Sequence, residues 1–204
     1  MCFRRTSLIL SLAVLAVLPR AAADETPTDA TAAPVDSRVQ EAARGLQSED
    51  EFLRQKAFLQ LEALRDPAAV PFIRPYADSK DADTRAWSLR ALVAIQGVDA
   101  VPLLIERLKS DQQPAVRRAV ILGLEPLLAK DPSLVPLMID RLDDRSPEVR
   151  IAAIDVVSRI DHPDARNAVR ARVKREGNRD VRKVLTAAMD RIQSAETHAP
   201  SEGI

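Results

Sequence analysis

One arginine recurs along the chain at nearly constant intervals, and this recurrence restricts the fold more than any other feature. Successive arginines stand 31, 32, 33 and 32 residues apart. Large apolar residues follow each arginine at offsets of seven and ten, and a mostly apolar position precedes it by one. These offsets trace one face of a helix with 3.6 residues per turn, so each repeat is predicted to begin with an amphipathic helix. The five arginines are Arg54, Arg85, Arg117, Arg150 and Arg182.

A second helix is expected to follow in each repeat. Three repeats carry a Val-Pro pair followed by apolar residues, and proline is tolerated in a first helical turn because that amide has no intrahelical partner. An aspartate lies just upstream of each pair, where it is predicted to cap the helix or favour its N-terminus. Short breaks join the two helices into hairpins. The pairs begin at Val70, Val101 and Val135, and the aspartates are Asp66, Asp99 and Asp131.

The first helices also carry a motif. Residues 83–92 read Asp-Thr-Arg-Ala-Trp-Ser-Leu-Arg-Ala-Leu, and residues 147–154 read Pro-Glu-Val-Arg-Ile-Ala-Ala-Ile. Both resemble the first helix of the HEAT repeats, especially the short HEAT-like repeats of the phycobilisome-lyase type. The resemblance covers about residues 49–192. It implies an all-α fold: a right-handed α-solenoid of about five helical-hairpin repeats, with second helices that line a concave surface. Such repeats serve many unrelated functions.

The first 23 residues have the pattern of a cleavable signal peptide. Arg4 and Arg5 precede an uncharged apolar run of about a dozen residues, and small residues at 21–23 suit a signal peptidase. A membrane span needs roughly 20 apolar residues, although a retained N-terminal anchor is the alternative. The expected divisions are a signal peptide (1–23), a disordered linker (24–35), a HEAT-like solenoid (36–193) and a disordered tail (194–204).

Cleavage after Ala23 predicts a secreted or periplasmic protein without stable membrane insertion. The single cysteine, Cys2, is removed with the leader. An oxidising compartment then holds no hazard for a free thiol, which agrees with export.

Composition excludes several classes of function. One cysteine and two histidines cannot supply a thiolate zinc site, an iron–sulfur cluster or a disulfide framework. A formal net charge of zero argues against a nucleic-acid partner. No cluster suits nucleophilic or acid–base catalysis, so the chain is predicted to be no enzyme and to need no cofactor. An accessory lyase domain and a structural spacer in an envelope assembly are the alternatives.

The recurring arginines of the first helices are interpreted as structural. In the family that the chain resembles, such an arginine bridges to acids of an adjacent loop. The expected partners here are Asp81 or Asp83 for Arg85, and Glu148 for Arg150.

A second series of arginines is the predicted binding site. Arg107, Arg141 and Arg172 occupy one position on successive second helices, and Tyr76 holds that position in the first repeat. Guanidinium groups in a row suit carboxylates, phosphates or an acidic peptide. Neighbouring carboxylates partly neutralise them, so a solvated, salt-bridged face is the competing interpretation. We call these four residues the second-helix stripe.

Trp87 is predicted to lie at the edge of that stripe. The five aromatic residues that follow the leader all fall between positions 52 and 87, and the other repeats hold Lys, Ala or Val at the position of Trp87. A large ring is therefore not required there by the fold and suits a binding hot spot. Core or inter-repeat packing is the competing interpretation.

Charge differs between the two ends of the repeat array. Residues 24–66 hold ten acids and five bases, whereas residues 162–192 hold nine bases and four acids. This asymmetry favours an anionic partner or a weak head-to-tail self-association, with a solvated terminal cap as the alternative. Together these features predict a non-enzymatic protein–protein interaction scaffold in the cell envelope. It would bind a protein or peptide on the concave second-helix face.

Overall fold

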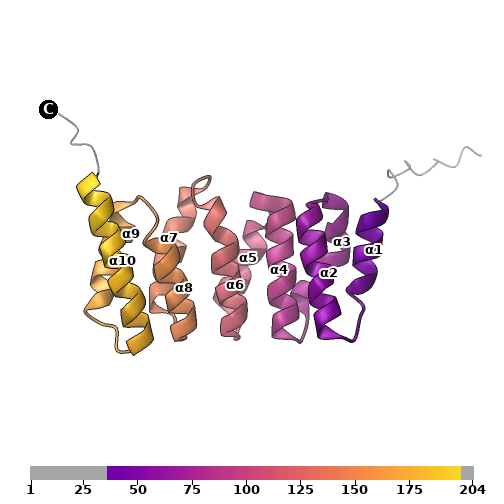
Figure 1. Ribbon diagram of the computed structural model, residues 1–204, viewed down its shortest axis with the longest axis horizontal. Coiled ribbons are helices and arrows are strands. Elements are labelled where there is room, and N and C mark those ends of the chain that lie inside the picture. The colour runs from indigo at the N-terminus through magenta and orange to yellow at the C-terminus, as the bar shows by residue number, and fades with distance from the viewer. Residues whose placement is uncertain (1–35, 199–204) are drawn as a thin grey trace, which may run out of the picture. The chain divides into compact units, whose positions relative to one another are not determined.

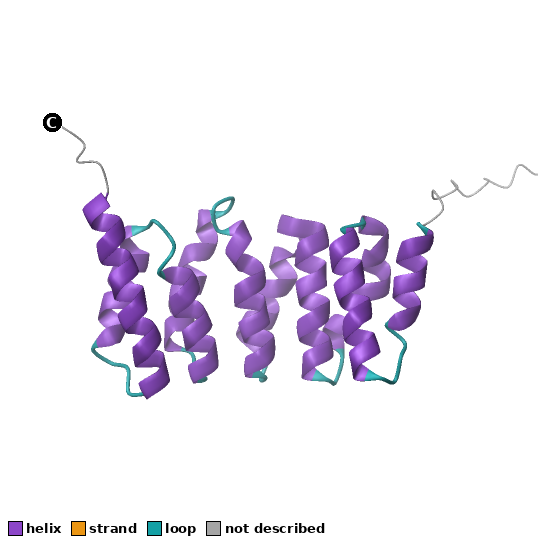
Figure 2. Ribbon diagram, viewed as in Figure 1, coloured by secondary structure: helices purple, strands orange, loops and turns teal. Residues whose placement is uncertain are grey.

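The computed structural model describes residues 36–198, and within this range every regular element is a helix (Figure 2). The predicted all-α solenoid is confirmed. The first helices form one layer and the second helices α3, α5, α7 and α9 lie behind it (Figure 1). The first helices are α2 (Glu51–Leu64), α4 (Ala82–Gln96), α6 (Pro114–Leu124), α8 (Pro147–Val157) and α10 (Arg179–His198).

The second helices are shorter, and 3-10 turns extend several of them. They are α3 (Val70–Ile73), α5 (Val101–Ser110), α7 (Val135–Asp140) and α9 (Pro163–Val173). The 3-10 turn Arg74–Asp78 continues α3, and Arg141–Asp143 continues α7. An additional helix, α1 (Ser37–Gly45), precedes α2 at the N-terminal end of the described residues.

Side-chain caps and proline determine where these helices begin. Asp66 accepts a hydrogen bond from the amide of Ala68 (2.9 Å), and Asp131 accepts one from the amide of Ser133 (3.1 Å). These two predicted caps are confirmed. Asp99 makes no capping bond, because it lies inside the 3-10 turn Gly97–Ala100. Gly97 adopts φ 58° there, a left-handed conformation that glycine takes at little cost.

The core lies between the two layers and repeats its own pattern. Each first helix packs on the next one along the chain, and each second helix fills the space between them. One buried position on the second helices is held in turn by Ala42, Ile73, Leu104, Met138 and Val169. Since Ala42 belongs to α1, α1 occupies the register of a second helix, and no first helix precedes it within residues 36–198.

Two sequence expectations need correction or qualification at the ends. The disordered tail was expected from residue 194, but α10 continues through Ser194 to His198. Its apolar periodicity ends near Ile192, whereas helical hydrogen bonding needs no apolar residue to continue for another turn. The expected signal peptide and linker lie outside the described residues.

Among the described residues, one stretch has the length and apolar content of a membrane span. It comprises residues 82–110. That stretch is folded as two antiparallel helices, α4 and α5, on either side of Gly97. Leu89, Leu92 and Leu104 are buried in the core, so the apolar content is accounted for by packing between repeats.

Candidate functional site

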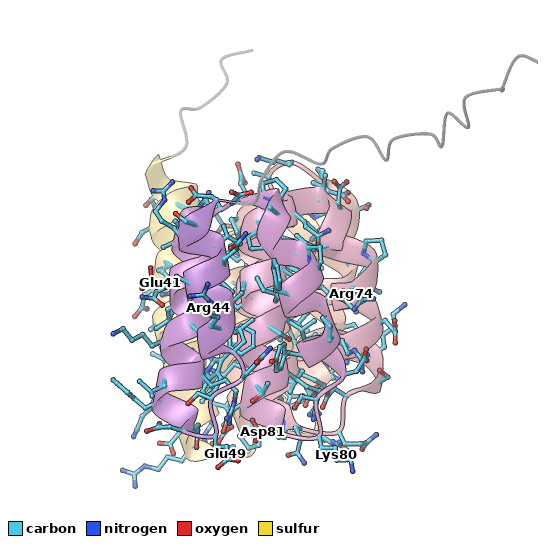
Figure 3. The ribbon with its side chains drawn as sticks, turned by 90° about the vertical axis from the view of Figure 1, so that its right-hand side faces the viewer. Glu41, Arg44, Glu49, Arg74, Lys80 and Asp81 are labelled. Carbon is cyan, nitrogen blue, oxygen red and sulfur yellow. The ribbon has the colours of Figure 1, made fainter. Side chains whose placement is uncertain are left out.

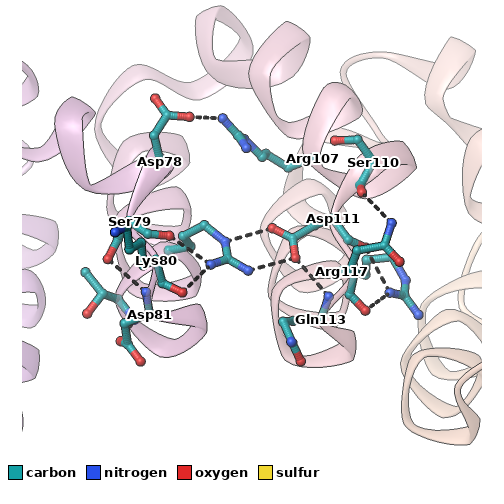
Figure 4. A network of polar contacts seen from close by, with 12 residues as sticks. Asp78, Ser79, Lys80, Asp81, Arg107, Ser110, Asp111, Gln113 and Arg117 are labelled. Atoms are coloured by element: carbon teal, nitrogen blue, oxygen red, sulfur yellow. Dashed lines mark hydrogen bonds and ion pairs between the residues drawn. The ribbon is translucent and has the colours of Figure 1, made fainter.

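The arginines of the first helices link each repeat to the one that follows. Nη1 of Arg85 donates to the carbonyl oxygens of Ser79 and Lys80, at 2.8 and 3.1 Å. Its Nε and Nη2 donate to both carboxylate oxygens of Asp111, at 2.8 and 2.9 Å (Figure 4). Asp111 lies 26 residues further along the chain, in the loop before α6. The arginine therefore joins its own loop to the loop of the next repeat.

The same bidentate pair recurs twice. Arg117 binds Asp144 at 2.8 and 2.7 Å, with both side chains buried, and Arg150 binds Glu176 at 2.9 and 3.1 Å. The structural interpretation of these arginines is confirmed, but the partners expected from the sequence are wrong. Asp81 instead caps α4 through the amide of Thr84 (2.7 Å), because its position in the same loop places it over the helix end.

The electrostatics of these pairs favour the charged forms. Burial opposes ionisation of Glu176, yet hydrogen bonds from Arg150 and Arg172 outweigh it and lower the pKa of Glu176 to about 2. Burial likewise opposes ionisation of Asp111 and Asp144, and the hydrogen bonds from their arginines still lower both pKa values. The network therefore stays ionised across the neutral range.

The residues of the second-helix stripe lie at equivalent positions on successive repeats, and their side chains are largely occupied within the protein. Each one reaches back to the preceding repeat. The Tyr76 hydroxyl donates to the carbonyl oxygen of Leu46 (3.0 Å), and Nη1 of Arg141 donates to that of Leu108 (3.4 Å). Arg107 pairs with Asp78 in the same sense (Figure 4).

Arg172 is the most strongly bound member of the stripe. It donates to Asp143 of the preceding repeat (2.5 Å) and to Glu176, which follows it by four residues (2.6 Å). In contrast, the Nε atoms of Arg107 and Arg141 are buried and find no partner among the described residues. The stripe thus holds neighbouring repeats together, and two of its guanidinium N–H groups have no hydrogen-bond acceptor among the described residues.

Trp87 lies in an aromatic cluster between the first two repeats, and this cluster also contains Tyr76 of the second-helix stripe. Its ring is tilted against Phe58 at a centroid distance of 6.3 Å, and Tyr76 meets Phe58 edge to face at 5.5 Å. Phe58 is fully buried, whereas Trp87 is partly buried against the core. Packing accounts for most of the Trp87 surface.

The N-terminal end exposes apolar side chains that the sequence reasoning missed. Leu53 is 47% exposed, although the matching residues Thr84, Val116, Val149 and Val181 are buried. No first helix precedes α1 within residues 36–198, and such a helix would cover this position. On the adjoining face of α2, Phe52 is 71% and Leu59 is 44% exposed. Aligning the repeats on their arginines could have revealed this apolar surface, because other repeats hold Asp83 or Glu148 at the position of Phe52.

A groove of about 600 Å³ lies beside Leu53 at this end of the described residues. Its walls are α1 and α2, which approach so closely that a Cβ on Gly45 would lie 2.9 Å from the Cβ of Ala57. Leu53, Ala57 and Leu64 contribute apolar surface, with Glu41 on the opposite wall. Figure 3 looks onto this end of the solenoid. We call the surface of Phe52, Leu53, Leu59 and this groove the N-terminal open end.

The C-terminal end shows the complementary gap. Val173 on α9 is 43% exposed, although the matching residues Leu46, Ala77, Leu108 and Leu142 are buried. A smaller hollow of about 220 Å³ lies between α9 and α10, lined by Val173, Leu185 and Met189 among others. Here the second helix of the last repeat is absent from residues 36–198.

No group of three or more His, Cys, Asp or Glu side chains that could hold a metal ion occurs among the described residues. The His162 ring accepts a hydrogen bond from the amide of Asp164 (3.2 Å) and thereby caps α9. This histidine has a structural role at the start of the helix.

Comparisons with known proteins agree with this architecture. The sequence profile described as HEAT repeats matches residues 39–125 and 101–190. The solved complex of CpcE and CpcF of phycocyanin lyase from Nostoc sp. PCC7120 contains a similar chain, with 21% identity and a TM-score of 0.62. The match covers 74% of this chain and 96% of that one.

A second similar structure is the Escherichia coli protein YibA. It has 19% identity and a TM-score of 0.60, and the match covers 79% of this chain and 60% of that one. These similarities concern the fold. None of the curated proteins matches the sequence at a significant level.

Proposed function

Because this chain belongs to the HEAT-repeat family, we propose that it is an exported, non-catalytic protein-binding module of the cell envelope whose partner contacts the N-terminal open end. The HEAT-repeat scaffold supports a role in protein interaction. The observation that carries the choice of surface is the exposure of Leu53, at a position that every other repeat buries.

The chemistry of the open end suits a protein partner. Apolar side chains grouped on a surface gain free energy when another chain covers them, and aromatic residues dominate such contacts. Phe52 and Leu59 are not required by the packing of α2, because both project away from the core. A partner helix laid along α2 would cover both and enter the groove.

The second-helix stripe is a second candidate surface. Two observations favour it: the unpartnered Nε donors of Arg107 and Arg141, and a polar hollow of about 320 Å³ beside Arg141. A carboxylate of an acidic peptide would suit such donors. Asp140, Asp143 and Asp144 line the same hollow and oppose an anion, so this surface ranks below the open end.

An accessory role in an enzyme is the alternative function. One similar structure belongs to a phycocyanin lyase complex. This alternative predicts a partner with catalytic residues of its own, because we identify no catalytic cluster among the described residues of this chain. Location in the envelope rests on the leader sequence. N-terminal sequencing of the exported protein is expected to begin at Asp24.

A crosslinking comparison tests the proposed surface. A photoreactive residue at Gln60, which lines the groove, is expected to trap the partner in intact cells. Phe52→Ser combined with Leu59→Ser should reduce trapping at least tenfold. Leu122→Ser is the matched control, because Leu122 is exposed at the position of Leu59 two repeats further on. Full trapping by the double variant, with loss on Arg107→Gln and Arg141→Gln, would assign the site to the second-helix stripe.

A further inference from the structure

The described residues, 36–198, begin with a second helix and end with a first helix. α1 has the register of a second helix, as the buried Ala42 and the hydrogen bond from Tyr76 to the Leu46 carbonyl both indicate. The bond from Arg141 to the Leu108 carbonyl follows the same pattern: a side chain of one second helix donates to a carbonyl oxygen of the preceding second helix. At the other end, α10 is a first helix with no second helix after it among residues 36–198. Each end is therefore half of one hairpin.

The N-terminal groove lies where a first helix before α1 would pack, and residues 36–198 contain no such helix. Leu53 and Gln60 are exposed there, whereas their counterparts on α4, α6, α8 and α10 face the preceding first helix and are buried. The position of Gln60 is held elsewhere by Ala91, Gly123, Val156 and Ala188, all buried. A first helix parallel to α2 would cover this face and contact α1 as well.

The exposed face of α10 is the face that a following repeat would cover. Thr186 stands exposed at a position where Phe58, Leu89, Ile121 and Ile154 are buried. Met189 is only partly covered, whereas Leu61, Leu92, Leu124 and Val157 are fully buried at that position. Val173 completes the apolar part of this surface.

We propose that α10 of one copy of the chain occupies the N-terminal groove of the next copy, so that the two half-hairpins complete one repeat. This inference rests on the proposed function in one respect, because it assigns a partner to the N-terminal open end. The contact is heterologous: two different surfaces meet, each copy keeps one unused end, and the assembly grows as an open chain.

Charge supports the same pairing. Within residues 36–198 the Arg182 guanidinium donates only to the carbonyl oxygen of Gly177 (3.2 Å), whereas Arg85, Arg117 and Arg150 each bind a carboxylate of the next repeat. In the proposed contact, the next repeat is the next copy. The register position of the partner acid is Ser48 in the next copy, but Glu49 stands beside it (Figure 3), and Asp50 and Glu51 follow at the start of α2, so negative charge lies where Arg182 would approach.

The remaining segments of the chain fit the groove less well. Residues 24–34, which directly precede α1, contain no large apolar side chain and lack what a first helix buries. The apolar run of the leader lies further away and is lost on cleavage at Ala23. The contact itself is modest, because Thr186 replaces a large aliphatic residue. Association should therefore be weak and salt-dependent.

Sedimentation velocity on the chain from Asp24, which retains the whole solenoid, tests the proposal. The weight-average sedimentation coefficient is expected to rise with concentration and to fall back at high salt. Leu53→Glu blocks the groove and Met189→Glu blocks the α10 face. Each variant alone should remain monomeric, whereas an equimolar mixture should form dimers and nothing larger, because each dimer then has two blocked ends. Leu122→Glu is the control and should associate like the parent chain.

Three outcomes overturn the proposal: a sedimentation coefficient independent of concentration, self-association of either blocked variant alone, or a mixture that stays monomeric. Circular dichroism establishes that the variants fold. A cysteine pair offers an independent readout, since no cysteine remains after residue 23. Gln60→Cys and Asp190→Cys on separate chains should form an intermolecular disulfide on mixing, because they match Gly123 and Val93, where a Cβ on Gly123 would lie 4.0 Å from the Cβ of Val93. If the chain stays monomeric while the Phe52/Leu59 variant still loses its partner, the inference fails and the proposed function stands.

Discussion

The middle of the solenoid and its two ends use the same positions in different ways. In the middle, Arg117 finds Asp144 in the next repeat, and both side chains are buried. At the ends, Arg54 reaches only the hydroxyl of Thr84 (3.3 Å) and two carbonyls of its own loop, and Arg182 reaches a single carbonyl. Identical residues therefore differ in what they contribute, because each repeat supplies half of its neighbour's interactions. Stability concentrates where both neighbours are present, and unused surface concentrates where one is missing.

Removing the buried carboxylate in the middle should have the largest effect. Asp144→Ala leaves Arg117 charged, buried and without its partner, and it also removes the acceptor of the Ser146 amide. We expect a loss of about 3–5 kcal/mol in the free energy of unfolding, measured by urea denaturation. Arg182→Ala, the change at the open end, should cost less than about 0.5 kcal/mol. Equal losses for the two variants would refute the contrast.

Truncating an apolar side chain should separate the two regions next. Leu124 is fully buried between repeats, so Leu124→Ala should cost about 2–5 kcal/mol. Leu53→Ala removes a half-exposed side chain and should cost about 1 kcal/mol or less. The same denaturation experiment measures both. A Leu53→Ala cost as large as that of Leu124→Ala would mean that the groove is already covered in the free protein.

Acid should weaken the middle through Glu176. Its folded-state pKa of about 2 lies below its ordinary value of 4.5, so its contribution is fully present above about pH 4.5. That contribution, about 3 kcal/mol, is lost as the pH falls toward 2. Denaturation midpoints measured between pH 7 and pH 2.5 should fall for the parent chain. They should fall less steeply for Glu176→Gln, and an unchanged slope would assign the acid sensitivity to other groups.

The smallest effect should come from adding to the first repeat interface the carboxylate that the middle interfaces already have. Ser79 stands six residues before Arg85, as Asp111 stands before Arg117, and its hydroxyl accepts the amide of Asp81 (3.2 Å). Ser79→Asp keeps that acceptor and places a carboxylate within reach of Arg54. We expect a gain of about 1 kcal/mol in the free energy of unfolding. The gain should vanish in an Arg54→Gln background, and a gain that persists there would show that it has another source.

Periodicity made the helices and the repeat number predictable, because both are local properties of the sequence. The partner of each arginine was not predictable in this way. Arg85 and Asp83 are neighbours in sequence, but the superhelical stacking brings Asp111 closer. Trp87 illustrates the same limit: the other repeats hold Lys, Ala or Val at its position, yet Phe58 of the preceding repeat contacts its ring. The open ends were not predictable for a further reason, since the exposure of Leu53 depends on the lack of a first helix before α1 within residues 36–198 and not on any residue nearby.

The spacing of the ion pairs also decides where this protein tolerates added length. Each partner acid stands six residues before the next arginine, over 111–117, 144–150 and 176–182, whereas the stretch from arginine to acid is 26, 27 and 26 residues long. The additional residue falls in the repeat whose helices are joined through Lys130 and Asp131. A guest peptide inserted there would leave every arginine in register with its acid. The same peptide inserted within 144–150 would separate the acid from the next arginine and disconnect two repeats. The solenoid therefore tolerates added length between the two helices of a repeat and not between the acid and the arginine that follows it.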